Sequence, residues 1–137
     1  MDPLVKLQKR AVRLIAGVKK YEHTDPLFRK FKILKLHQIY IYVVQIIMYK
    51  YNHELLPSIF KKFFSRNQDI HHINIRCQNL YRPSLINSDP GKRTIRVTGV
   101  RTWNYFDNHI CFQSSLVSYK LSLKNHLVVY DLSLISN

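Results

Sequence analysis

The chain has few acidic residues, few glycines and few cysteines, and each shortage excludes a class of functional site. Its eight Asp and Glu residues are dispersed over 137 positions, which argues against a metal centre built from several carboxylates. The three glycines are too scattered to form a phosphate-binding P-loop or a dinucleotide-binding fingerprint. The two cysteines, Cys77 and Cys111, do not make a disulfide framework.

The chain also lacks a hydrophobic run long enough to cross a membrane. The longest apolar stretch, residues 39–49, is interrupted by Gln45 and followed by Lys50, whereas a spanning helix needs about 20 apolar residues. Lysine and arginine are mixed into residues 1–13, which is unlike a signal peptide. We therefore expect an intracellular protein, nuclear or cytoplasmic, with reduced thiols and no membrane partner.

What the chain has in excess is positive charge. It carries 22 Lys and Arg against 8 Asp and Glu, a formal net charge of +14. Its hydrophobic content of 46% argues against wholesale disorder, and its length fits one domain. The charge exceeds what solubility requires of a small domain, so we expect a polyanionic partner. Nucleic acid is the first candidate and an anionic membrane surface is the second.

The charge divides the chain into two segments. Residues 1–66 carry a net charge of +10 and residues 67–137 a net charge of +4. We predict a mainly α fold, in which the first segment is a small basic helical unit. The second segment is predicted to hold a β-hairpin or loop insertion and a C-terminal helix, and the two segments are expected to form one continuous domain.

The first predicted helix covers residues 4–16 and has two distinct faces. Apolar residues recur at spacings of three and four, which predicts a face that packs on the core; they are Leu4, Leu7, Ala11, Leu14, Ile15 and Val18. Basic residues recur at the same spacings on another face, which suits a run of phosphates; they are Lys6, Lys9, Arg10 and Arg13. A solvated amphipathic helix is the alternative interpretation of this pattern.

Two further helices are predicted in the first segment. A short one begins near residues 23–26, because Thr24 or Asp25 can cap a helix and Pro26 suits the first helical position. A longer one over residues 37–51 is apolar nearly all round and is predicted to be the buried central helix. Its helical period runs through Leu36, Ile39, Tyr40, Val43, Ile46, Ile47 and Lys50. The aromatic residues that follow are interpreted as core rather than as base-stacking platforms; they are Phe60, Phe63 and Phe64.

The middle of the chain is predicted to form a β-hairpin. Residues 93–98 alternate in the manner of a strand, a turn at residues 89–91 precedes them, and residues 81–86 are the expected pairing partner. The last helix is predicted to run from Ser114 or Ser115 to about residue 130. Its predicted buried face contains Leu116, Tyr119, Leu123, Leu127 and Tyr130.

Histidine and cysteine residues offer two weaker candidates for chemistry. A zinc site can be drawn from the ligand types His71, His72, Cys77, His109 and Cys111. Their spacing matches no CxxC or HxxxH pattern, and structural zinc needs four well-placed ligands. His109 and Cys111 also resemble a base and nucleophile pair, but no orienting group or oxyanion loop accompanies them. We therefore interpret these histidines as scattered surface residues.

Cations interleaved with aromatic residues remain as the functional candidates. Arginine pairs with phosphate in bidentate fashion, and aromatic side chains stack on unpaired bases. Trp103 is interpreted as a core anchor rather than a stacking residue. The predicted nucleic-acid-binding residues are Lys6, Lys9, Arg10, Arg13, Lys19, Lys20, Arg76, Arg93, Arg96 and Arg101. No catalytic residue, metal or cofactor is expected.

Several strings in the chain occur in an order that resembles a known family. They include Leu7-Gln8-Lys9-Arg10-Ala11-Val12-Arg13-Leu14-Ile15, His23-Thr24-Asp25-Pro26-Leu27-Phe28, Ile33-Leu34-Lys35-Leu36, Met48-Tyr49-Lys50-Tyr51, Leu55-Leu56-Pro57 and Trp103-Asn104. The ordered set resembles the region downstream of the polymerase palm in reverse transcriptases of non-LTR, LINE-type (jockey-like) retrotransposons. The resemblance covers about residues 3–130. The chain departs from the family in two places. Ile73 and Ile75 flank Asn74, where the family usually has Tyr and Thr on either side of the asparagine, and Tyr105-Phe106 follows Trp103-Asn104, where the family tends to have Leu-Pro.

The resemblance implies a nucleic-acid-binding C-terminal fragment of a retrotransposon RNA-directed DNA polymerase. Residues 1–66 would correspond to a thumb-like segment that grips RNA or an RNA–DNA hybrid through its phosphates. The family's polymerase holds magnesium on palm aspartates, including a Tyr-x-Asp-Asp-type motif, and no such string occurs here. We therefore expect no enzyme activity, and expect a polymerase palm domain as a further partner. The alternative is a non-catalytic structural or interaction remnant that packed on an absent polymerase domain.

Overall fold

The computed structural model of the chain is mainly helical, as predicted. It describes residues 2–67, 80–84, 86, 88–92, 94–106 and 113–129. The helical elements are α1 (Pro3–Ala16), α2 (Asp25–Lys30), α3 (Leu36–Asn52), the short 3-10 helix η1 (Ser58–Phe60), α5 (Asp89–Lys92), α6 (Ile95–Tyr105) and α8 (Leu116–Val129). Within these described ranges, strand pairing is limited to one isolated antiparallel bridge between Arg66 and Tyr81.

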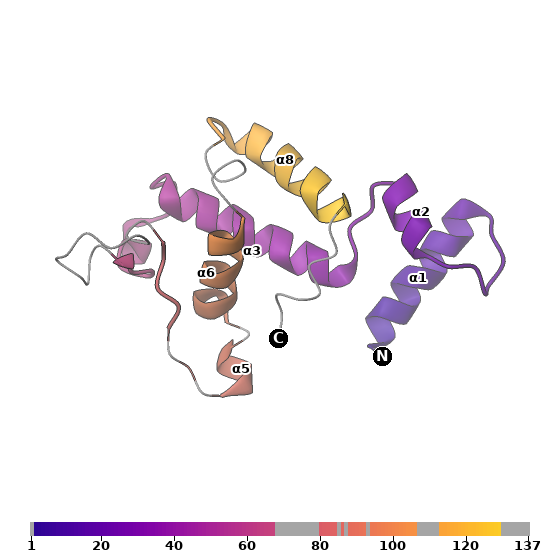
Figure 1. The fold of residues 1–137 in the computed structure, drawn as a ribbon, viewed down its shortest axis with the longest axis horizontal. Helices are drawn as coiled ribbons and strands as arrows, with labels where there is room; N and C mark the ends of the chain where they lie inside the picture. The colour runs from indigo at the N-terminus through magenta and orange to yellow at the C-terminus, as the bar shows by residue number, and fades with distance from the viewer. Residues whose placement is uncertain are drawn as a thin grey trace.

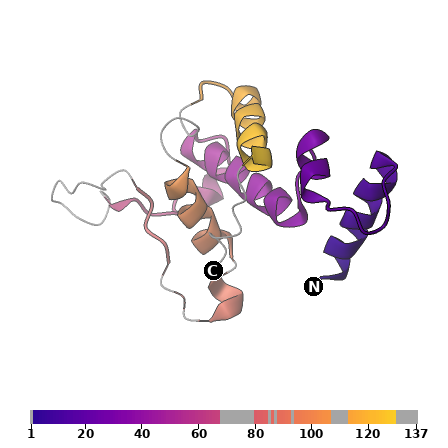
Figure 2. The same ribbon diagram turned by 45° about the vertical axis from the view of Figure 1, so that its right-hand side comes forward.

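Helix α3 is the centre of the fold (Figure 1). Both α6 and α8 pack against it, while α1 and α2 lie together at its N-terminal end (Figures 1 and 2). The ring of Tyr119 in α8 stacks on Tyr49 in α3, with centroids 4.4 Å apart. On the α6 side, a Cβ added to Gly99 would meet the Met48 sulfur at 3.1 Å, so the glycine permits the close approach of the two helices.

The prediction of a buried central helix is confirmed, but the sequence period followed the wrong face of it. The residues of α3 that are buried are Gln38, Ile41, Val44, Gln45, Met48 and Tyr49. On the face that the period followed, Ile39, Tyr40 and Val43 are between 41% and 49% exposed. The buried face includes two glutamines, and these are satisfied by hydrogen bonds: Gln38 donates to the Leu127 carbonyl and Gln45 donates to the Thr102 hydroxyl. Because burial of these amides depends on partners far along the chain, periodicity of apolar residues could not identify this face.

The predicted hairpin is wrong. Residues 95–105 form helix α6, and residues 89–92 of the predicted turn form the short helix α5. Tyr81, expected to begin the partner strand, bridges Arg66 instead. The short alternation in residues 93–98 also fits a helix. The buried residues Val97, Val100 and Trp103 recur every three positions, a helical spacing, on the side of α6 that faces α3.

The core confirms three other predictions. Trp103 is buried between the rings of Tyr81 and Tyr119, with centroids 6.5 Å and 6.2 Å away. The last helix forms, with Ser115 accepting a hydrogen bond from the Ser118 amide at its start. Of its predicted buried face, Tyr119, Leu123 and Leu127 are buried, Leu116 is half-buried, and Tyr130 lies outside the described residues. Of the three phenylalanines predicted as core, Phe64 is buried and Phe63 half-buried, but Phe60 is 37% exposed.

Helix α1 is attached to the fold by a different face from the one predicted. Its buried residue is Val12, and Gln8 on the same side holds the linker before α3. The side-chain nitrogen Nε2 of Gln8 donates to the Leu34 backbone carbonyl (2.9 Å), and its side-chain oxygen Oε1 accepts from the Leu36 backbone N–H (3.0 Å). The apolar face predicted to be core instead points to solvent, with Leu4, Leu7, Leu14 and Ile15 between 59% and 74% exposed. Helix α1 therefore has three faces: one docked, one basic and one apolar and exposed.

None of the helices in the described part of the chain combines the length and apolarity that spanning a bilayer requires.

The exposure of the apolar face of α1 predicts a small effect of polar substitution. We expect Leu14→Gln/Ile15→Gln to change the free energy of unfolding by less than about 0.5 kcal/mol, since both side chains already contact water. The buried Val12→Ala should cost roughly 1–2 kcal/mol. Urea denaturation followed by circular dichroism measures both. A loss in the double variant equal to that of Val12→Ala would mean that this face is packed.

The C-terminal part of α8 predicts a loss of stability in acid. Burial lowers the pKa of His126 below its ordinary value of 6.5, and its ring packs edge-on against Phe106 at 5.4 Å. The unfolded chain therefore takes up this proton at a higher pH than the native chain, so the free energy of unfolding falls as the pH drops below 6.5. We expect His126→Gln to lose less stability than the wild type between pH 7.5 and 5.5. Since both proteins share the other histidines, equal losses would contradict the assignment to His126.

Candidate nucleic-acid interface

The candidate interface is built on α1, whose two ends are well defined by its sequence. Asp2 caps the helix by accepting a hydrogen bond from the Leu4 amide (2.9 Å), and Pro3 occupies the first turn. Gly17 ends it with a left-handed backbone, φ 65°. The Val18 amide then donates to the Arg13 carbonyl (3.2 Å), which turns the chain back beside the helix. This turn brings residues after Gly17 near the basic face.

Four predicted cations line one groove at this place. The groove has a volume of about 480 Å³, and it is lined by Lys6, Arg10, Arg13, Leu14, Val18 and Lys20. Along the helix, Lys6 and Arg13 are separated by about 10 Å at a rise of 1.5 Å per residue. Successive phosphates of one strand are about 3.4 Å apart along a duplex axis. The row of cations thus matches a run of about three phosphates.

The cations of the groove are not neutralised by the described part of the chain. Lys6, Arg10 and Lys20 form no ion pair with any described carboxylate, and the ion pair of Lys35 with Asp25 (3.0 Å) lies in the α2 region. Arg13 uses its Nε to donate to the Glu22 carbonyl oxygen (2.9 Å), which ties the loop after α1 to the helix. That bond uses one of its five N–H donors, so the guanidinium keeps others for a phosphate.

The remaining predicted residues are distributed around the molecule. Lys9 and Lys19 lie on α1 and the following loop but do not line the groove. The Arg96 guanidinium lies over the Phe63 ring at 4.4 Å from its centroid, and Arg101 is exposed on α6. Helix α6 lies away from α1 in both views (Figures 1 and 2). The other two predicted residues, Arg76 and Arg93, lie outside the described residues.

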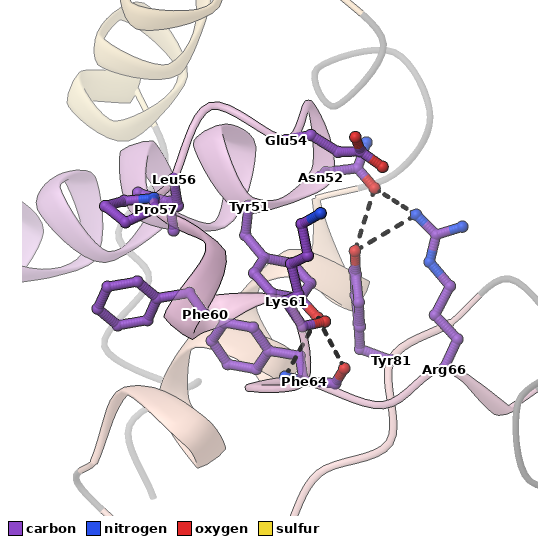
Figure 3. Close-up of a pocket in the computed structure, with 10 residues that line it drawn as sticks. All are labelled: Tyr51, Asn52, Glu54, Leu56, Pro57, Phe60, Lys61, Phe64, Arg66 and Tyr81. Carbon is purple, nitrogen blue, oxygen red and sulfur yellow. Dashed lines mark hydrogen bonds between the residues drawn. The ribbon is translucent and has the colours of Figure 1, made fainter.

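A second feature, which the sequence did not indicate, lies at the C-terminal end of α3 (Figure 3). It is a pocket of about 540 Å³, lined by Tyr51, Asn52, Glu54, Leu56, Pro57, Phe60, Lys61, Phe64, Arg66 and Tyr81. Arg66 and Tyr81 both donate hydrogen bonds to the side-chain oxygen Oδ1 of Asn52, at 2.6 Å and 3.1 Å. Aromatic and basic residues around positions 60–66 are visible in the sequence, but nothing there links them to Asn52 or Tyr81.

The backbone of the pocket is strained at one residue. Glu54 has φ 55°, a left-handed conformation that glycine normally supplies at the end of a helix. The Leu55 amide donates to the Lys50 carbonyl (2.8 Å) across this turn and so completes the end of α3. A side chain in this conformation costs roughly 1–2 kcal/mol. The turn places the Glu54 carboxylate at the rim, beside Asn52 (Figure 3).

Metal-ligating side chains do not cluster in the ranges that the structure describes: no group of three or more His, Cys, Asp or Glu residues comes together there. The zinc-ligand candidates of the sequence fall outside those ranges; they are His71, His72, Cys77, His109 and Cys111.

Comparisons of the chain with models of protein families, with curated proteins and with solved structures gave no match.

Proposed function

We propose that the chain binds RNA or an RNA–DNA hybrid through the basic groove of α1. The observation that carries the proposal is that four cations line one groove: Lys6, Arg10, Arg13 and Lys20. Arg13 is tethered to the loop after α1, and no described carboxylate pairs with the other three. Charge-assisted contacts to phosphate supply most of the sequence-independent affinity for nucleic acid.

The attachment of α1 favours a grip of fixed geometry. Gln8 and Val12 dock the helix on the side away from the groove, so the cations project from a helix that is already held in place. Binding then orders only the ends of the basic side chains, which limits the entropy lost on binding. The exposed apolar side chains of Leu14 and Val18 form part of the lining, so a bound ligand would also cover apolar surface.

The resemblance to non-LTR reverse transcriptases supports the choice of RNA or a hybrid as the polyanion. On this proposal the chain is a C-terminal, thumb and post-thumb portion of an RNA-directed DNA polymerase. Its role is to hold the nucleic acid by the backbone, while the palm aspartates that would carry out polymerisation belong to another part of the polymerase. The chain itself is then a binding module and not an enzyme.

A second candidate function is a packing surface for a polymerase palm domain. It is favoured by two exposed apolar faces, that of α1 around Leu7 and Leu14 and that of α3 around Ile39 and Val43. Apolar faces of this kind mark protein interfaces or association sites. On this reading the isolated chain self-associates, and Leu14→Gln/Ile15→Gln reduces that association. Size-exclusion chromatography with light scattering tests it, and a monodisperse wild-type monomer would exclude it.

The nucleic-acid proposal predicts a defined change in salt dependence. We expect Lys6→Ala/Arg10→Ala to weaken binding to a single-stranded RNA and to an RNA–DNA hybrid. For the single strand, the slope of log K against log salt should fall in magnitude by about 1.4, since each lost phosphate contact removes roughly 0.7. Fluorescence anisotropy between 50 and 200 mM KCl measures the slope. Both side chains are exposed, so the fold should be unaffected.

The matched control is Lys62→Ala/Lys124→Ala, which removes the same charge from exposed positions outside the groove. We expect the slope of this control to stay close to that of the wild type. If the two double variants change the slope equally, the groove has no special role and the binding reflects net charge alone.

A further inference from the structure

We propose that the pocket at the C-terminal end of α3 holds one unstacked nucleotide of a single-stranded nucleic acid. The base would lie against the aromatic wall and the phosphate against Lys61 and Arg66. The inference rests on the proposed function for the identity of the polymer, but the pocket is a separate site. It lies at the opposite end of α3 from α1 (Figure 1), and the 17 residues of that helix span about 25 Å.

The walls of the pocket have the composition that a nucleotide requires. Phe60 and Pro57 stand on one side, and Tyr81 with Arg66 stands on the other (Figure 3). Phe60 is the most exposed of the aromatic rings in the lining: Tyr51 is half-buried, and Phe64 and Tyr81 are buried. Aromatic faces bind bases of any sequence by stacking. The two cations outnumber the single carboxylate of Glu54, which favours an anionic ligand.

The Arg66 side chain and the backbone that carries Lys61 are both held in place before any ligand arrives. Arg66 donates to Asn52 and its guanidinium lies 5.3 Å from the centre of the Tyr81 ring. The loop that carries Lys61 is held on α3 by Tyr51, whose hydroxyl lies 2.9 Å from the carbonyl oxygens of Lys61 and Phe64. A preorganised arginine beside a lysine is suited to phosphate, because little side-chain freedom is lost on binding.

A polar edge completes the pocket. Because arginine can only donate, the Asn52 oxygen must face Arg66, and this orients its amide nitrogen away from that side. The Glu54 carboxylate also lines the pocket. An N–H donor and a carboxylate acceptor within one pocket match the paired acceptor and donor groups on the edge of a base. Unpaired nucleotides expose this edge, whereas paired ones do not, so the pocket favours single strands.

The test compares two neighbouring lysines that differ in their place. Lys61 lines the pocket and Lys62 does not, and both are exposed. We expect adenosine 5′-monophosphate to bind the wild type. Lys61→Ala should weaken that binding about fivefold or more and Lys62→Ala should leave it within about twofold, since of these two lysines only Lys61 would contact the phosphate. Titrations followed by NMR chemical shifts report both the affinity and the position of the ligand.

A second matched pair tests the stacking wall. Phe60→Ala removes the exposed ring and should weaken binding about 5- to 150-fold, the range of one base stack. Ile59→Ala, the 83% exposed neighbour outside the pocket, should have no effect. Adenosine and inorganic phosphate serve as part-ligands. Each should bind more weakly than the nucleotide, because each fills only one half of the site.

The outcomes separate this inference from the proposed function. Binding of the nucleotide no tighter than inorganic phosphate, or equal effects of Lys61→Ala and Lys62→Ala, would overturn the pocket inference. In that case, a reduced salt slope in the α1 variants would still support nucleic-acid binding in the groove. Conversely, nucleotide binding with the expected variant effects supports the pocket even if the groove variants fail to alter the slope.

Discussion

The fold depends on the satisfaction of one buried amide, that of Gln45 in the middle of α3. Gln45 is fully buried, and it donates to the Thr102 hydroxyl of α6, which in turn donates to the Thr98 carbonyl (2.7 Å). From α8, the Tyr119 hydroxyl lies 3.3 Å from both the carbonyl oxygen and the side-chain oxygen of Gln45. An amide left without partners at this depth would cost several times what a net hydrogen bond contributes. The requirement therefore fixes how α6 and α8 sit along α3.

Both candidate sites depend on the ends of the helix that this network holds. At the N-terminal end, Gln38 joins the Lys35 amide to the α8 carbonyl of Leu127, and Gln8 of α1 binds the linker just before it. At the C-terminal end, the last turn of α3 supplies Tyr51 and Asn52, which hold the loop and the arginine of the pocket. Side-chain amides thus attach each functional region to the core. Of the groove cations, Lys6, Arg10 and Lys20 take no part in this scaffold and are exposed at the surface.

The same amides explain what the sequence could and could not predict. Helices α1, α2, α3 and α8 follow from apolar periodicity and from start signals such as Pro26. Their orientation does not follow, because the docked side of α1 is chosen by Gln8 and Val12 rather than by its leucines. For α6 the sequence pattern predicts a strand over residues 93–98. Six residues rich in β-branched side chains are too few to distinguish the two-residue period of a strand from the 3.6-residue period of a helix. The basic row of α1 is visible in the sequence. That Lys20 lines the same groove is not, because Lys20 reaches the groove through the turn at Gly17.

The orientation of α1 carries a further consequence for how the charge is used. Had the leucines packed on the core as predicted, the basic row would have been the outer face of an ordinary amphipathic helix. With Val12 and Gln8 docked instead, the basic face and the apolar face are both exposed and lie next to one another. Mutual repulsion of the cations opposes the compact state of a chain with net charge +14. A polyanion in the groove relieves that repulsion and at the same time covers Leu14 and Val18, which line it. Electrostatic attraction and burial of apolar surface would therefore favour the same bound state of the groove.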